Sequence, residues 1–247
     1  MRAPDGTVIA QDDNSSEGRH ARIVLALPTT GSYVVGANTS YAGESGPYEV
    51  TLQAATVAEV AQAEQFAEAQ RLDQQVWQLY QAGHYEAAIP LAQQALAMRE
   101  QMLGATDPDV ANSLNILARL YYVQGQYEQA EPLYVRSHQI YEATLGANHP
   151  DTANNLSNLA ELYRKQGNYG EAESLLLRSL AIYTATLGEA DPTVALILNN
   201  LAELYQDQGR YGEAESLFLR SLALYESALG EAHPTVALPL NNLALLY

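Results

Sequence analysis

A unit of 42 residues recurs along most of this chain. The dipeptide Leu-Gly marks it at residues 103–104, 145–146, 187–188 and 229–230. Two other residues keep the same interval, a proline (Pro108, Pro150, Pro192, Pro234) and a tyrosine (Tyr85, Tyr127, Tyr169, Tyr211). A repeat of this length restricts the fold to an array in which each unit packs mainly against its neighbours.

Each unit predicts two helices. Gly146 follows an apolar-periodic stretch and suits the left-handed residue that ends a helix, and Pro150 suits the first position of the next helix. His149 precedes that proline, where Asp107 and Asp191 stand in the neighbouring units as better N-caps. The first helix then ends at Gly167, and a second is expected from about Tyr169 to Thr186.

Both helices of a unit carry one apolar stripe at helical spacing. The stripes of the unit that begins at Leu145 are Leu156, Leu159, Ala160 and Tyr163, then Ala172, Leu176, Leu180 and Tyr183. Alanines recur where backbones must approach closely, at Ala118, Ala160 and Ala202 in the first helix and at Ala130, Ala172 and Ala214 in the second. One hairpin cannot bury its stripe alone, so the units must stack.

The recurring pattern Leu-x2-Leu-Ala-x2-Tyr-x3-Gly-x-Tyr-x2-Ala resembles the tetratricopeptide repeat. It reads Leu156, Leu159, Ala160, Tyr163, Gly167, Tyr169 and Ala172 in one unit, and it recurs in register on both sides. The ordinary repeat has about 34 residues; the form of 42 is similar to the kinesin light chain type, which is also abundant in bacterial, including cyanobacterial-style, multidomain proteins. The resemblance covers about residues 70–247 and implies a mainly α fold, a tetratricopeptide-type α-solenoid of antiparallel helix hairpins.

The ends of the array are irregular. We expect an atypical first hairpin at 56–102, repeats at 103–144, 145–186 and 187–228, and a partial repeat at 229–247. The first hairpin opens with a Thr56…Glu59 capping box, and its second helix is expected from Tyr85 to Met102. Pro239 should disturb the last helix. The partial repeat also leads us to expect that this chain is a piece of a longer protein.

Residues 1–55 have a different character. Short β-branched and aromatic stretches at 7–10, 21–27, 32–37 and 47–53 alternate with turn residues, which predicts antiparallel strands. Their order resembles the C-terminal part of the bacterial pre-peptidase C-terminal (PPC) domain, a β-sandwich. The matching elements are Asp5-Gly6, Asp12-Asp13, Leu27-Pro28, Gly31-x-Tyr33 and Gly46-x-Tyr48. We therefore expect a small, partial N-terminal β-sandwich.

The charge balance restricts the partners. The formal net charge is −17, whereas nucleic acids and anionic membranes require a basic patch, so we expect neither as partner. There are no cysteines, which excludes disulfides, zinc-thiolate sites and a cysteine nucleophile. No signal peptide is visible at the start, and the sequence leaves the localisation open.

No motif for catalysis or a cofactor is present. The sequence contains no G-x-S-x-G, phosphate loop or G-x-G-x-x-G, so we expect no enzyme, no cofactor and no small-molecule substrate. The histidines form no metal-ligand pair, and His149 and His233 suit helix starts. Asp12 and Asp13 are weak calcium candidates, although ordinary turns explain them better. Most tyrosines, including Tyr211, fall on the packing register and should be core.

The other face of each first helix remains as the candidate binding site. Asparagine has both a donor and an acceptor, so a row of asparagines can bind an extended peptide backbone in a groove, as the kinesin light chain resemblance also implies. Two alternatives involve no ligand: the face is simply solvated, or its asparagines form hydrogen bonds between neighbouring repeats. The candidates are Asn112, Asn115, Arg119, Tyr122, Asn154, Asn158, Glu161, Lys165, Asn199, Asn200, Glu203, Gln206, Asn241 and Asn242.

Three functions are compatible with these features. The first is a protein–protein interaction scaffold that binds a peptide or partner protein in the concave groove of the solenoid. The second is the recognition or regulatory region of a larger enzyme, such as a CHAT-type protease, whose catalytic domain lies outside this chain. The third is a spacer or oligomerisation element.

Overall fold

The computed structural model describes residues 57–246, with side chains from residue 61 on. The expected β-sandwich of residues 1–55 and the calcium candidates Asp12 and Asp13 lie outside the described residues. The described part of the chain contains helices and no strand. They are α1 (Val57–Gln81), α2 (Tyr85–Leu103), α3 (Pro108–Val123), α4 (Tyr127–Thr144), α5 (Pro150–Lys165), α6 (Tyr169–Leu187), α7 (Pro192–Asp207), α8 (Tyr211–Leu229), the 3-10 turn η1 (Pro234–Val236) and α9 (Ala237–Leu246).

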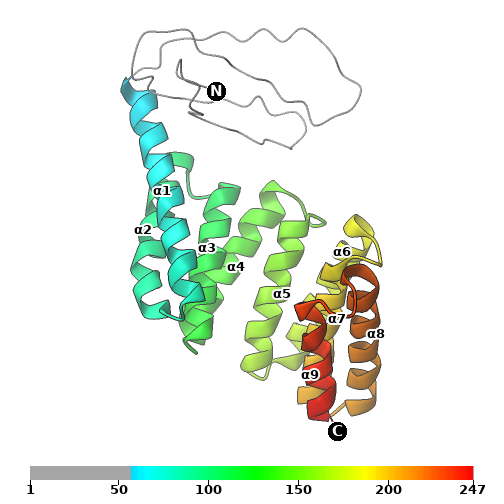
Figure 1. The fold of residues 1–247 in the computed structure, drawn as a ribbon. Coiled ribbons are helices and arrows are strands. Elements are labelled where there is room, and N and C mark those ends of the chain that lie inside the picture. The colour runs from blue at the N-terminus through cyan, green and yellow to red at the C-terminus, as the bar shows by residue number, and fades with distance from the viewer. Residues whose placement is uncertain (1–56, 247) are drawn as a thin grey trace, which may run out of the picture. The chain divides into compact units, whose positions relative to one another are not determined.

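The chain divides into two units, residues 1–68 and 69–247, with the boundary inside α1. In the second unit, consecutive helices pair as antiparallel hairpins, α3 with α4, α5 with α6 and α7 with α8. Each hairpin packs on the next through α4·α5, α6·α7 and α8·α9, so the stack follows the chain order (Figure 1). The predicted helical solenoid is therefore confirmed for this unit.

From α3 on, each unit begins at a capped proline. The side chains of Asp107 and Asp191 accept a hydrogen bond from the backbone N–H two residues on, at 2.9 and 2.7 Å. The Nδ1 atoms of His149 and His233 accept the equivalent bonds at 3.2 and 3.3 Å. The predicted role of these histidines at helix starts is confirmed, and it requires an unprotonated Nδ1.

Left-handed glycines end the helices as predicted. Gly146 has φ +96° and Gly167 has φ +81°, a region that residues with a Cβ rarely adopt. After Gly167 the N–H of Asn168 donates to the carbonyl of Tyr163, 2.9 Å away, which satisfies a carbonyl that the helix leaves free. The chain can therefore reverse at once into α6.

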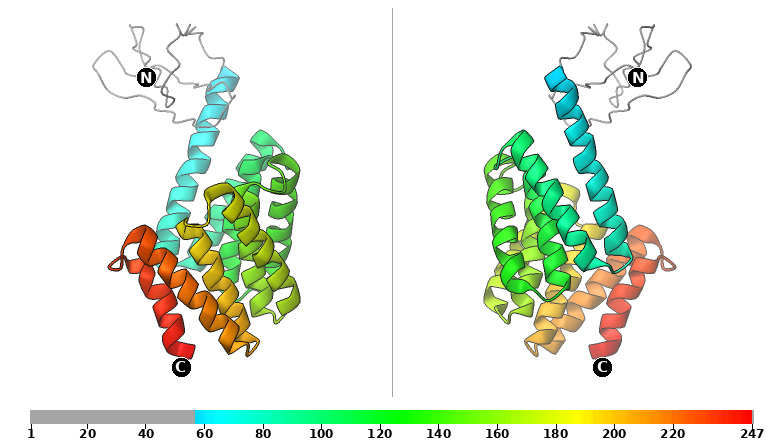
Figure 2. Two further views of the ribbon diagram at one scale, coloured as in Figure 1. Left: turned by 90° about the vertical axis from the view of Figure 1, so that its right-hand side faces the viewer. Right: turned by 90° about the vertical axis from the view of Figure 1, so that its left-hand side faces the viewer.

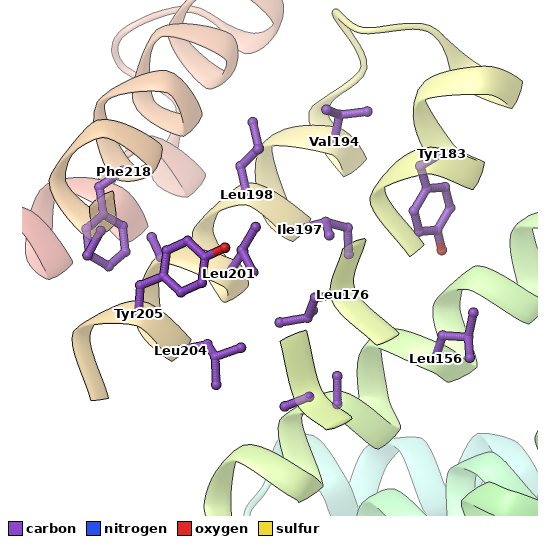
Figure 3. Packing of buried hydrophobic residues seen from close by; sticks show 14 of the residues in the cluster. Leu156, Leu176, Tyr183, Val194, Ile197, Leu198, Leu201, Leu204, Tyr205 and Phe218 are labelled. Carbon is purple, nitrogen blue, oxygen red and sulfur yellow. The ribbon is translucent and has the colours of Figure 1, made fainter. Parts of the chain in front are cut away.

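The core follows the predicted stripes (Figure 3). Leu156 and Leu198 are fully buried, as are the alanines predicted at the close approaches. A further contact recurs in the second helices, where a buried serine forms a hydrogen bond to the first helix of the same hairpin. The Oγ atoms of Ser137, Ser179 and Ser221 donate to the carbonyls of Ala111, Ala153 and Ala195 at 2.8, 2.9 and 2.7 Å.

The end of the stack, where α9 follows α8 (Figure 2), differs from the preceding repeats in two features. The 3-10 turn η1 replaces the first helical turn, and α9 begins at Ala237, so that Pro239 stands in its first turn, where its missing N–H costs nothing. The predicted disturbance at Pro239 is confirmed. The prediction that Tyr211 is core is wrong, since its side chain is 60% exposed. The reason is that only the ten residues of α9 follow α8 in the described stack.

Candidate functional site

The first helices of successive hairpins form one layer. Helices α3 and α5, α5 and α7, and α7 and α9 touch directly, whereas each second helix meets mainly its own partner and the first helix of the next unit. We call the polar side chains that this layer turns away from the second helices the first-helix face. Of the fourteen predicted residues, thirteen are exposed or half-buried, and Asn199 is fully buried.

A row of amide hydrogen bonds crosses the first-helix face from helix to helix. The Nδ2 atom of Asn158 donates to Oδ1 of Asn115 at 3.2 Å, and that of Asn242 donates to Oδ1 of Asn199 at 3.0 Å. Between them, Asn200 donates to Oγ of Ser157 at 3.3 Å. Each bond joins residues 43 positions apart, one more than the repeat length, so this row is a property of the 42-residue interval.

The row uses only part of the hydrogen-bonding capacity of most of these amides. Asn158 and Asn200 are half-buried and spend a donor on the preceding helix, which leaves their carbonyl oxygens free of a described protein partner. Asn199 differs, because it is fully buried, donates to Glu203 at 2.8 Å and accepts from Asn242. Its contacts are internal to the stack.

A second row connects residues 39 positions apart. Arg119 donates through Nε to the hydroxyl of Tyr80 at 3.0 Å, and the hydroxyl of Tyr122 donates to Glu161 at 2.8 Å. Burial and then the Glu161 carboxylate raise the pKa of Tyr122 above its usual range, which keeps the hydroxyl protonated as a donor. The next member of this row is an arginine.

Arg164 joins α5 to α7 through three carboxylates. Its guanidinium contacts Glu161 at 2.6 Å, Glu203 at 3.0 Å and Asp207 at 2.5 Å, and only 7% of its side chain is exposed. Burial disfavours its charge, but bonding and attraction from Glu161, followed by Glu203 and Asp207, raise the pKa of Arg164 above its usual range. The arginine is therefore a permanent cation between the two helices.

The remaining candidates are less engaged. Asn112 and Asn154 occupy equivalent exposed positions near the starts of α3 and α5. Lys165 is exposed, with Nζ 3.9 Å from Glu161. Gln206 is half-buried, and Asn241 of α9 is exposed. The face thus combines free amides at one edge with a charged network at the other.

Sequence reasoning missed three residues that belong to these rows. Ser157 is the counterpart of Asn115 and Asn199, and Arg164 is the counterpart of Tyr122 and Gln206. The third, Tyr80, stands 42 residues before Tyr122. The repeat interval was sufficient to find each of them, because strict register points to the same helical position in every unit.

An apolar pocket lies at the N-terminal end of this face, between α1 and α3. Its volume is about 90 Å³, and its lining residues are Asp73, Val76, Trp77, Tyr80, Ile116, Arg119 and Leu120. The rings of Trp77 and Tyr80 stack with their centroids 5.7 Å apart. The guanidinium carbon of Arg119 lies 4.9 Å from the centroid of the Tyr80 ring, a cation–π contact.

The described residues offer neither a metal cluster nor a membrane span. Among residues 57–246, no group of three or more His, Cys, Asp or Glu side chains could hold a metal ion. In that same range, none of the helices is long and apolar enough to cross a membrane.

These features define a class of protein, the α-solenoids built from stacked helix hairpins. The chain belongs to the tetratricopeptide repeat family: one model of this repeat matches residues 109–185 and 193–247, more than half of the chain, and a second matches residues 74–140. This fold is typically a non-catalytic scaffold. No curated protein matches the chain at a significant level.

Solved structures support the same fold. A putative kinesin light chain of Podosopora anserina with nearly identical repeats is 28% identical, with 76% of this chain and 85% of that chain covered and a TM-score of 0.59. BtubC (BKLC) from P. vanneervenii is 21% identical over 76% and 84% of the two chains, with a TM-score of 0.54. A Rap protein complexed with competence and sporulation factor is 18% identical over 70% and 46%, with a TM-score of 0.61.

Proposed function

We propose that this chain is a protein–protein interaction scaffold that binds an extended peptide or a peptide segment of a partner on the first-helix face. The observation that carries the proposal is the row of amides in register across α3, α5, α7 and α9. Amide groups left over from this row suit a peptide backbone, which presents alternating donors and acceptors.

The family supports this assignment. Tetratricopeptide repeats are scaffolds for protein partners, and the Rap protein of the same fold was solved with competence and sporulation factor. We further propose that the repeats are of the kinesin light chain-like type, since 42 residues separate the capped prolines and the putative kinesin light chain is 28% identical.

The internal bonds of the face explain why its asparagines serve two purposes. The bonds from Asn158 and Asn200 hold successive first helices at a fixed offset. A ligand would therefore meet a preorganised surface, which reduces the entropy lost on binding. The exposed Asn112 and Asn154 make none of the described hydrogen bonds between helices. Replacing them therefore tests ligand binding without disturbing the stacking of the helices.

The test is a selection of random-sequence peptides displayed on phage against the purified chain, followed by fluorescence anisotropy with the selected peptides. The double variant Asn112→Ala, Asn154→Ala should weaken binding by about tenfold, as expected for two lost hydrogen bonds. The control is Gln139→Ala, which removes an exposed amide from the outer helix α4 and should leave binding unchanged. Selected peptides that bind both variants as well as the parent would contradict the proposal.

A further inference from the structure

From the pocket between α1 and α3, we infer the kind of peptide that the first-helix face takes: a segment with a branched aliphatic side chain next to a carboxylate, the aliphatic group in the pocket and the carboxylate on Arg119. This inference rests on the proposed function and specifies its ligand.

The pocket selects for an aliphatic side chain by its size and lining. Val76, Ile116 and Leu120 supply aliphatic walls, and the stacked rings of Trp77 and Tyr80 supply a rigid aromatic one. A cavity of about 150 Å³ is known to admit benzene, so a pocket of about 90 Å³ suits a valine or leucine side chain better than a larger aromatic one. Trp77 is 53% exposed, and burying it under a ligand would release water from apolar surface.

Arg119 supplies the charge complementarity. Five other arginines contact carboxylates: Arg99, Arg136, Arg164, Arg178 and Arg210. Arg119 is exposed, and its contacts with described residues are the hydroxyl and ring of Tyr80. These contacts occupy Nε and one face of the guanidinium, and they fix its orientation. Its two terminal nitrogens remain available to donate two parallel hydrogen bonds to the two oxygens of one carboxylate.

The other acidic groups nearby do not compete for Arg119. Asp73, which also lines the pocket, is bonded to Arg99 from α2. Glu161, the next residue along the face, is held by Arg164 and Tyr122. Further along, Glu203 and Asp207 make the face acidic around Arg164, which disfavours a second carboxylate there. The acidic group of the peptide is therefore directed to the α1–α3 end.

The experiment uses the full chain and the same random-peptide display library. Peptides selected on the parent should share a valine, leucine or isoleucine within two positions of an aspartate or glutamate. Arg119→Glu should weaken these peptides by about tenfold, the loss for one charge-assisted pair, and a new selection on this variant should replace the acidic residue by lysine or arginine. Trp77→Ala, which removes the outer wall of the pocket, should weaken the aliphatic preference and keep the acidic one.

The matched control is Arg220→Glu in α8, which reverses an exposed arginine away from the pocket and should change neither affinity nor consensus. Circular dichroism melts confirm that each variant is folded. Peptides that need Asn112 and Asn154 but show no aliphatic–acidic consensus, and no change of charge preference with Arg119→Glu, would overturn this inference and leave the proposed function standing. Peptides insensitive to both sets of variants would overturn both.

Discussion

The Nδ2 atom of Asn158 in α5 donates a hydrogen bond to Oδ1 of Asn115 in α3, 3.2 Å away and 43 residues earlier in the chain. The same geometry recurs from Asn242 in α9 to Asn199 in α7. A repeat that fixes apolar packing thus also fixes a polar row on the opposite side of the first helices. The first-helix face is consequently as regular as the core, and individual replacements within it can be compared between units.

The contact of Arg164 with three carboxylates predicts a large loss of stability when the arginine is removed. Arg164→Met should leave Glu161, Glu203 and Asp207 close together without a counter-charge and lower the free energy of unfolding by about 2–3 kcal/mol. Urea denaturation followed by circular dichroism measures this. Arg178→Met, which breaks a pair whose partners are 39% and 43% exposed, should cost less than about 1 kcal/mol. Equal losses in the two variants would contradict a special role for Arg164.

Two fully buried asparagines should respond oppositely to replacement. Neither side-chain atom of Asn155 has a described hydrogen-bond partner, and Ile197 occupies the equivalent position in α7. Asn155→Ile should therefore raise the free energy of unfolding by about 1–2 kcal/mol, because an unpaired buried amide is costly. Asn199→Ile removes an amide that is bonded on both sides and should lower stability by a similar amount. A destabilising Asn155→Ile would show that its amide has an unseen partner.

Two glycines three residues apart should also respond oppositely. Gly167 has φ +81°, and an added Cβ would touch nothing within 4 Å, so Gly167→Ala incurs only the cost of the left-handed conformation, about 1–2 kcal/mol. Gly170 lies in the first turn of α6, also in open space and without a positive φ. Gly170→Ala should therefore stabilise the protein by about 0.5 kcal/mol through helix propensity. Thermal melts of the two variants should move in opposite directions, and a shared direction would count against the assigned helix boundary.

His138 should make stability depend on pH. Burial lowers the pKa of His138 below its ordinary value, and its Nδ1 is buried without a hydrogen-bond partner among the described residues. Because the folded state favours the neutral ring, stability is retained above the unfolded pKa of about 6.5 and falls as the pH decreases from there through the lower folded value.

His138→Leu places the residue found at the equivalent positions 96, 180 and 222 and should remove this component. The measurement is the difference between the unfolding free energies of parent and variant from neutral to mildly acidic pH. A difference that does not grow as the pH falls would show that His138 titrates alike in both states.

The fold could be predicted well from the sequence because the interactions that define it are periodic and local. Pro150 and Gly167 delimit a helix by backbone chemistry alone, and Leu156 and Ala160 recur at the spacing of one face. The first-helix face was harder to predict, since its members are defined by contacts between helices. Asn199 and Asn200 are adjacent in sequence, yet Asn199 is sealed in the stack and Asn200 reaches across it to Ser157. The sequence pattern does not distinguish these two asparagines; the position of each first helix relative to the next one does.

The pocket at Trp77 lies beyond what a repeat signature can predict. The first unit departs from the consensus, because Trp77 and Tyr80 stand where the next unit has Arg119 and Tyr122. Their stacking and the cation–π contact of Arg119 arise from the meeting of an atypical helix with a regular one. Positions that depart from the repeat consensus can therefore give the array a specific ligand preference.

In the proposed function, the first helices, and not the second, form the ligand surface. Backbone amide chemical shifts of the isotope-labelled chain, recorded as a display-selected peptide is added, test this most directly. We expect the largest shifts in α3, α5 and α7 around Asn115, Asn158 and Asn200, with little change in α4, α6 and α8. Shifts centred instead on the outer surface of the second helices, around the exposed Leu177 and Leu219, would contradict ligand binding by the first helices.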